Sequence, residues 1–214
     1  IDHEILRETL RCKTDDPGVV WLIDRILESG RGVLRDDYDM VYFPGDDLLA
    51  ATRPRGLPIG NLTSQFWANV YLNRFDHFVK RELHCGGYVR YVDDFLLFGR
   101  DKGTLRAWRE ALIGRLARLR LTVHPGSHPR PVTEGIPFLG FTVFPDRRRL
   151  KRRKGIYFRR RLAKMQAGFR QGNIPVETIT ASVQGWVNHV RHGNTIGLRK
   201  AVLGQLPLQW GGSP

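Results

Sequence analysis

The sequence contains little cysteine and no long apolar run. Cys12 and Cys85 are its only cysteines, and they lie too far apart to match a disulfide framework or a metal-binding spacing. This usage suits a reducing cytosol, so we expect a cytoplasmic protein. No stretch of about 18 uncharged apolar residues occurs, and the sequence therefore predicts neither a membrane-spanning helix nor a membrane partner.

A natural start is also lacking. The first residue is Ile1 rather than Met, and no apolar signal segment follows it. We therefore expect the chain to be a fragment of a longer protein. Its 214 residues suffice for one domain with a sizeable core, or for one domain with a smaller appendage.

Acidic residues are scarce in the last third of the chain. From Ile1 to Asp146, 20 Lys and Arg residues balance 20 Asp and Glu residues, whereas 147–214 holds 15 Lys and Arg residues and one acid, Glu177. The whole net charge of +14 therefore comes from the last third. Such an uneven distribution is typical of nucleic-acid binders, although a solvated basic tail is the simpler alternative.

Apolar residues at helical spacing predict three helices in the first half of the chain, over 2–13, 18–29 and 63–83. Asp15 or Asp16 can cap the second helix, Pro17 lies near its start, and Gly30 ends it. Thr63 or Ser64 can cap the third. The segment 30–58 is rich in Gly, Pro and Asp and predicts a loop with a minor hairpin near 40–43.

The second half combines strands with further helices. A hairpin is predicted over 88–99, a helix over 105–119, and strands over 121–123 and 138–144 around a Pro-rich turn. This order predicts an α+β fold, with an antiparallel sheet and helices on one face. Short helices over 156–171, 176–192 and 195–206 carry the surplus charge and predict a separate module. We place the boundary near 146, giving domains 1–146 and 147–214.

One of four Asp-Asp pairs stands out. The pairs at 15–16, 36–37 and 46–47 have loop-like surroundings and are expected to be solvated turns or caps, whereas Asp93 and Asp94 lie between two apolar β-type runs. Adjacent carboxylates repel each other, and burying them costs several kcal/mol unless a cation compensates. Mg²⁺ bound at a turn would resolve this conflict. An exposed tight turn facing water is the alternative.

The segment Tyr91-Val92-Asp93-Asp94 resembles the Tyr-x-Asp-Asp box of reverse transcriptases. Three further segments are similar to motifs of that family, in the same order. They are the glycine motif and its helix at 56–69, the primer-grip hairpin at 135–141 and a bacterial thumb signature at 186–195. The resemblance implies a palm with an antiparallel sheet and helices on one face, followed by a small helical thumb. It also implies an RNA-directed DNA polymerase that uses paired Mg²⁺ ions, which Mn²⁺ can replace.

The resemblance also assigns roles to residues. Asp93 and Asp94 are the expected catalytic and metal-binding residues. The expected nucleotide and template contacts are Gly60, Asn61, Ser64, Gln65 and Tyr91, and the expected primer grip is Phe138, Leu139, Gly140 and Phe141. Contacts to the nucleic-acid backbone are expected from Arg147, Arg148, Arg149, Lys151, Arg152, Arg153, Lys154, Arg159 and Arg160. The expected partners are an RNA template, a DNA or RNA primer, deoxynucleoside triphosphates and an accessory protein.

Details of the motifs bear on the subfamily. Most relatives have Gln-Gly and Ser-Pro where this chain has Ile59-Gly60 and Ser64-Gln65. The Ser-Gln ending resembles reverse transcriptases of diversity-generating retroelements. A retron-like or group II intron-like enzyme is the alternative within the family, and a non-catalytic RNA-binding remnant is the alternative of another class.

Two departures from the family pattern stand out. The family's first metal-binding aspartate would precede Ile1, so we expect Asp2 to start a helix and the isolated fragment to be inactive. Many relatives carry a lysine in the turn after Val123, where this chain offers only His128 or Arg130.

Overall fold

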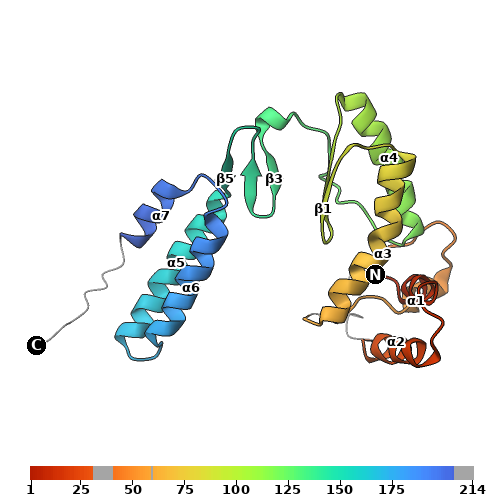
Figure 1. Cartoon of the computed structure of the whole chain (residues 1–214), viewed down its shortest axis with the longest axis horizontal. Coiled ribbons are helices and arrows are strands. Elements are labelled where there is room, and N and C mark those ends of the chain that lie inside the picture. Colours follow the sequence, from red (N-terminus) through yellow and green to blue (C-terminus); the bar gives the residue numbers. More distant parts are fainter. Residues whose placement is uncertain (31–40, 59, 205–214) are drawn as a thin grey trace, which may run out of the picture. The chain divides into compact units, whose positions relative to one another are not determined.

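The computed structural model describes residues 1–30, 41–58 and 60–204 of the chain (Figure 1). The chain forms two compact units, Ile1–Pro129 and Arg130–Pro214. The change in charge predicts a boundary near residue 146. The structural boundary lies earlier in the sequence, between 129 and 130, because the strands before 146 pack with the C-terminal helices. The second unit has sixteen Lys and Arg residues, and its acids are Glu134, Asp146 and Glu177.

The first unit consists mainly of helices with one hairpin. Its elements are α1 (His3–Arg11), α2 (Pro17–Ser29), a 3₁₀ turn η1 (Leu48–Thr52), α3 (Leu62–His77), a π-helical turn η2 (Phe78–Glu82), β1 (Gly87–Tyr91), β2 (Asp94–Phe98) and α4 (Lys102–Arg118). The predicted helices and the predicted hairpin are therefore confirmed, and the third helix runs through η2 to Glu82.

Capping explains where the first two helices begin. The carboxylate of Asp2 accepts hydrogen bonds from the backbone N–H groups of Glu4 and Ile5, so Asp2 starts α1 as expected. Asp16 caps α2 in the same way. The predicted capping of the third helix by Thr63 or Ser64 is wrong. Asn61 is the N-cap of α3, and its side chain makes no capping hydrogen bond.

Two predicted strand segments in the first unit are also wrong. Of the minor hairpin near 40–43, Met40 lies outside the described residues, and Val41 to Phe43 form no strand. Residues 121–123 pair with no described strand. Leu121 and Val123 instead pack against the core of the first unit, so their apolar character reflects burial rather than sheet formation.

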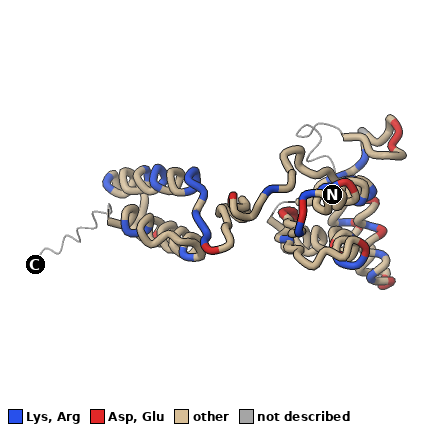
Figure 2. Tube along the Cα trace, turned by 90° about the horizontal axis from the view of Figure 1, so that it is seen from above, with Lys and Arg blue, Asp and Glu red and all other residues tan. Residues whose placement is uncertain are grey.

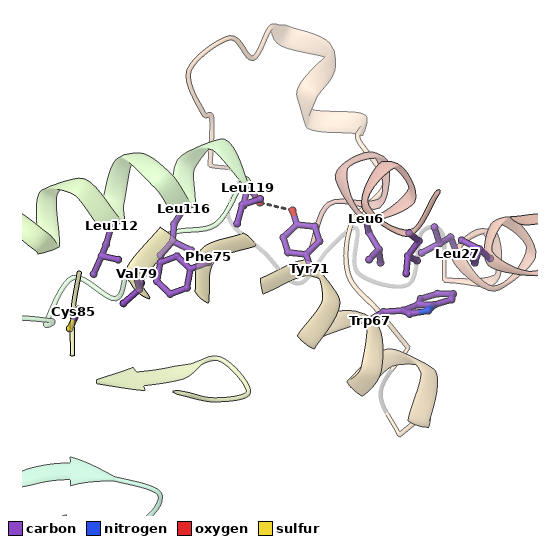
Figure 3. Close-up of a cluster of buried hydrophobic side chains, with 12 residues drawn as sticks. Leu6, Leu27, Trp67, Tyr71, Phe75, Val79, Cys85, Leu112, Leu116 and Leu119 are labelled. Carbon is purple, nitrogen blue, oxygen red and sulfur yellow. Dashed lines mark hydrogen bonds between the residues drawn. The ribbon is translucent and has the colours of Figure 1, made fainter. Parts of the chain in front are cut away.

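The core of the first unit is built on one face of α3. Tyr71 and Phe75 are spaced four residues apart on this helix, Val79 continues the spacing into η2, and all three are fully buried (Figure 3). Leucines of α1, α2 and α4 belong to the same cluster. The ring of Phe75 lies 5.1 Å from that of Phe95, so β2 of the hairpin packs against the same helix.

A buried group of charges joins distant parts of this unit. The Asp2 carboxylate is paired with Arg120 at 2.8 Å and with Arg53 at 3.3 Å, and Arg53 also binds Asp46 at 2.7 Å. The hydroxyl of Tyr71 donates to the backbone oxygen of Leu119 and accepts from the backbone N–H of Asp2. These bonds hold the start of α1, the segment around η1, the middle of α3 and the end of α4 together.

The second unit combines a small sheet with helices. Its elements are a 3₁₀ turn η3 (Val132–Glu134), β3 (Ile136–Phe138), β4 (Phe141–Val143), β5 (Arg148–Leu150), α5 (Arg152–Arg170), α6 (Val176–Val190) and α7 (Ile196–Leu203). The three predicted C-terminal helices and the α+β class are confirmed. The continuous strand 138–144 is wrong, because Leu139 and Gly140 form a turn. The single predicted sheet is wrong as well, because the described strands form two separate sheets, β1-β2 and β3-β4-β5.

The helices and the sheet of the second unit share one core. The ring of Phe158 in α5 stacks on that of Trp186 in α6 at 4.3 Å. The ring of Phe141 in β4 packs against that of His189 at 5.0 Å. Asn194 accepts from the backbone N–H of Arg148 and donates its own backbone N–H to the oxygen of that residue, which fixes β5 to the segment between α6 and α7. None of the described helices has the length and apolar character needed to cross a membrane.

The buried charges predict a specific sensitivity to acid. The hydrogen bond from Arg53, helped by the backbone N–H of Phe43, lowers the pKa of Asp46 from 3.8 to about 2. Because this pKa is lower in the folded state, the bond stabilises the protein fully above about pH 4, and this stabilisation is lost as the pH falls to about 2. Asp46→Asn should therefore lower the urea midpoint at neutral pH, and its difference from wild type should shrink between about pH 4 and about pH 2.

The control for this experiment is Asp15→Asn, which changes an exposed carboxylate outside the charge cluster. Its urea midpoint should follow that of the wild type at every pH. A difference between Asp46→Asn and wild type that stays constant down to about pH 2 would contradict the role given to the Asp46–Arg53 pair.

Candidate metal and nucleic-acid site

The acid pair lies at the tip of the β1-β2 hairpin. Tyr91 of β1 pairs with Asp94 of β2, so Val92 and Asp93 form a two-residue turn. Val92 has a φ of +57°. A β-branched residue rarely adopts this left-handed conformation, which costs about 1–3 kcal/mol and persists only where the surroundings enforce it. The turn that presents Asp93 is therefore strained.

The tip is open to solvent. Tyr91 is 59% exposed and Val92 46% exposed, and both Asp93 and Asp94 are exposed. Burying two adjacent carboxylates among apolar residues would cost free energy, because both charges would lose their hydration. The structure avoids this desolvation by placing Asp93 and Asp94 beyond the packed part of the hairpin. Exposure leaves both carboxylates accessible to a cation or to a substrate.

Arg90 connects the tip to α3. Its Nε and Nη2 atoms donate to the two carboxylate oxygens of Asp76, at 2.8 and 2.6 Å. Its Nη1 atom donates to the backbone oxygen of Val92 at 2.7 Å and to the side-chain oxygen of Asn69 at 3.0 Å. The hydroxyl of Tyr88 donates to Asp76 at 2.6 Å. Burial, followed by the bond to Asp76, raises the pKa of Tyr88.

The same network reaches the glycine motif. The side-chain amide of Asn69 donates to the backbone oxygen of Gln65, one turn earlier in α3. Gln65 and Asn61 are exposed near the start of this helix. Gly60 has a φ of +94°, and apart from its own chain neighbours no described atom lies within 4 Å of the place where a Cβ would stand. Glycine is thus favoured at this position by its backbone conformation rather than by a close contact.

Ser64 behaves differently from its neighbours in the motif. It is only 9% exposed, and its hydroxyl oxygen has no hydrogen-bond partner among the described residues. The structure therefore brings Asn61 and Gln65 to the surface but turns Ser64 inward. Ile59, which stands where most reverse transcriptases have glutamine, lies outside the described residues.

The acid pair offers a small donor set for a metal. In the described parts of the chain, no three His, Cys, Asp or Glu side chains are grouped to hold an ion. Two carboxylates are compatible with Mg²⁺, which keeps several waters and is bound through one or two carboxylates together with substrate phosphates. Asp2 is not available for this role, because it caps α1 and is paired with Arg53 and Arg120.

The predicted primer-grip residues lie in the second unit. Phe138 and Phe141 face each other in the β3-β4 pairing, and Leu139 and Gly140 form the turn between them with φ values of +46° and +85°. Phe141 is buried against the ring of His189, whereas Leu139 is exposed at the tip. Of the four predicted primer-grip residues, Leu139 is thus the exposed one and the most accessible to a ligand.

The predicted backbone-contacting residues run from the β4-β5 turn into α5 (Figure 2). Arg147 is paired with Asp146 and lies 4.4 Å from the centre of the Phe144 ring. In the described part of the chain, no acid forms an ion pair with any of the others, which are all exposed: Arg148, Arg149, Lys151, Arg152, Arg153, Lys154, Arg159 and Arg160. These cations are available for phosphate groups.

Sequence reasoning missed the residues that support the tip. Tyr88 and Arg90 are two residues apart on β1, and side chains at this spacing point to the same face of a strand. Asn69 and Asp76 are seven residues apart on α3, which places them on one face of that helix. This pair of patterns, polar residues two apart on an apolar strand and seven apart on the preceding helix, was the available signal.

No known family model matches the chain, and no curated protein matches its sequence. The function is therefore inferred from the site residues and from the charge of the second unit.

The strained turn predicts an unusual effect of glycine. Val92→Gly should raise the free energy of unfolding by about 1 kcal/mol, because glycine adopts a positive φ without strain. Val89→Gly is the matched control, since Val89 is 48% exposed but lies inside β1. It should lower the free energy of unfolding by about 0.5–1 kcal/mol. Urea denaturation measures both, and a destabilised Val92→Gly would contradict the strain.

Proposed function

We propose that this chain provides the palm and thumb of a reverse transcriptase, an enzyme that copies RNA into DNA. The observation that carries the proposal is the network from Gln65 through Asn69 and Arg90 to Val92. It links the helix that follows the glycine motif to the turn that presents Asp93. Both segments resemble reverse-transcriptase motifs, and their contact is the arrangement that a shared site requires.

The reaction is attack of a primer 3′-hydroxyl on the α-phosphate of a deoxynucleoside triphosphate. Asp93 is the principal ligand for Mg²⁺ and Asp94 its acidic neighbour. The bound metal, Mg²⁺ or Mn²⁺, supplies charge stabilisation for phosphoryl transfer. The exposed side chains of Asn61 and Gln65, with the free backbone N–H groups at the start of α3, orient the triphosphate and the templating base.

The second unit holds the nucleic acid. Exposed cations without acidic partners favour contacts to phosphates, which position a duplex without reading its sequence. Tyr157 is 64% exposed on α5. Its helical spacing places it beside Arg153 and Arg160, so an aromatic ring lies among the cations. The tip of the β3-β4 hairpin, at Leu139 and Gly140, steadies the primer end.

Within the family, we propose a diversity-generating retroelement enzyme. The ending Ser64-Gln65 supports this choice, and Gln65 is the exposed member of the pair. A template repeat and a variable repeat near the gene, differing at adenines, would support it further. An intron RNA around the gene would favour the group II intron-like alternative instead.

The assigned chemistry predicts the effect of removing Asp93. The complete protein that contains this chain should extend a DNA primer on an RNA template only with Mg²⁺ or Mn²⁺. Asp93→Ala should reduce the extension rate about a thousandfold or more, because a catalytic metal supplies several kcal/mol of transition-state stabilisation. Asp15→Ala, which removes an exposed acid from another Asp-Asp pair, should extend at the wild-type rate.

The measurement is a primer-extension time course on a gel. Undiminished extension by Asp93→Ala would refute the role of Asp93. RNA binding without any metal-dependent extension by the wild type would favour the non-catalytic RNA-binding alternative.

The basic face of α5 predicts a change in salt dependence. A variant with both Arg153→Gln and Arg160→Gln should bind an RNA–DNA duplex more weakly, and its slope of log affinity against log salt should fall by about 2, since each lost phosphate contact removes about 1. Fluorescence anisotropy between about 50 and about 200 mM salt measures this slope. A variant with Arg81→Gln and Arg118→Gln, exposed arginines of the first unit, has the same charge and should keep the wild-type slope.

A further inference from the structure

Arg90 is fully committed to contacts within the protein. Two of its nitrogens hold the carboxylate of Asp76, and the third bonds both Val92 and Asn69. Its side chain is only 12% exposed. The hydrogen bond with Asp76 raises the pKa of Arg90, so the guanidinium stays charged. A cation that is already paired and mostly buried is a poor candidate for binding a substrate phosphate.

The bond to Val92 acts directly on the neighbouring aspartate. The backbone oxygen of Val92 belongs to the rigid peptide unit that also contains the nitrogen of Asp93. Holding this oxygen at 2.7 Å from Nη1 of Arg90 therefore fixes the plane from which the Asp93 side chain departs.

Nothing in the hairpin alone would maintain this geometry. A two-stranded hairpin is marginally stable in water by itself, and the positive φ of Val92 adds strain. Asp76 and Asn69 lie on α3, whose opposite face is anchored in the core by Tyr71 and Phe75. Phe95 and Tyr88 hold the strands against α3, and Arg90 bonds this helix to the backbone of the turn itself.

We propose that Arg90 is a positioning residue, which aims the Asp93 carboxylate at a divalent cation by holding the Val92–Asp93 peptide against α3. The proposal rests on the metal-binding role of Asp93 in the proposed function. It assigns the effect to the geometry of the guanidinium and not to its charge, which Asp76 already balances. A lysine keeps the charge but lacks the planar fork that reaches Asp76, Asn69 and Val92 together.

The test uses the 214-residue chain and Mn²⁺ alone as the probe. Paramagnetic broadening of assigned amide resonances locates the ion, and titration gives its affinity. In the wild type, the amides of Asp93 and Asp94 should broaden first. Arg90→Lys should bind Mn²⁺ about 10-fold to 100-fold more weakly, the usual effect of removing a partner that orients a metal ligand. The amide shifts of Val92 and Asp93 should also move in Arg90→Lys before any metal is added.

The controls separate positioning from folding and from charge. Arg74→Gln removes an exposed arginine from α3 and should keep the wild-type Mn²⁺ affinity. Asn69→Ala removes only one partner of Arg90 and leaves the Asp76 pair, so it should fold and bind Mn²⁺ more weakly than wild type. It serves as the decisive variant if Arg90→Lys fails to fold.

Two outcomes overturn different statements. If the wild type binds Mn²⁺ at Asp93 and Asp94 but the folded Arg90→Lys and Asn69→Ala variants bind it equally well, the positioning role of Arg90 is wrong and the metal site remains. If Mn²⁺ broadens neither acid in the wild type, the metal-binding role of Asp93 fails, and the proposed function fails with it.

Discussion

The first unit depends on the burial of Tyr71 in the middle of α3. Its ring fills the core, and its hydroxyl donates to the backbone oxygen of Leu119 and accepts from the backbone N–H of Asp2. Burial of this hydroxyl raises the pKa of Tyr71, so it stays protonated and able to donate. Both backbone groups would otherwise lack a partner inside the protein, at a cost of about 1–3 kcal/mol each. One side chain thus joins the start of α1 and the end of α4 to the helix between them.

The candidate site uses the opposite face of the same helix. Tyr71 and Phe75 fix α3 from the core side, while Asn69 and Asp76 receive Arg90 on the other. Burial of one face makes α3 rigid, and the bonds of Arg90 to this helix and to Val92 restrain a turn that would be weakly ordered in an isolated hairpin. One face of α3 therefore packs the core, and its other face helps to place the turn that carries Asp93.

The sequence predicts local features of this protein better than long-range ones. The helices follow from apolar residues at a spacing of three or four, and the hairpin at 88–99 follows from two β-type runs, both of which are local signals. The strand at 121–123 was wrong because an apolar run does not reveal whether it will pair or merely pack, and Leu121 packs. The division into two sheets depends on pairings that no short segment specifies. Arg90 was missed because its partners Asn69 and Asp76 lie on another element.

Charge is used differently in the two units, and this difference bears on what each does. In the first unit the well-buried cations Arg53 and Arg90 have carboxylate partners, so removing either member of a pair would leave an uncompensated charge inside the fold. In α5, Arg160 and Arg161 stand four and three residues before Lys164, and in the described part of the chain no acid forms an ion pair with these cations. Like charges on neighbouring turns of a helix destabilise it by about 0.2–0.5 kcal/mol per pair. A polyanion lying along α5 would offset this repulsion, which agrees with the phosphate contacts proposed for these cations.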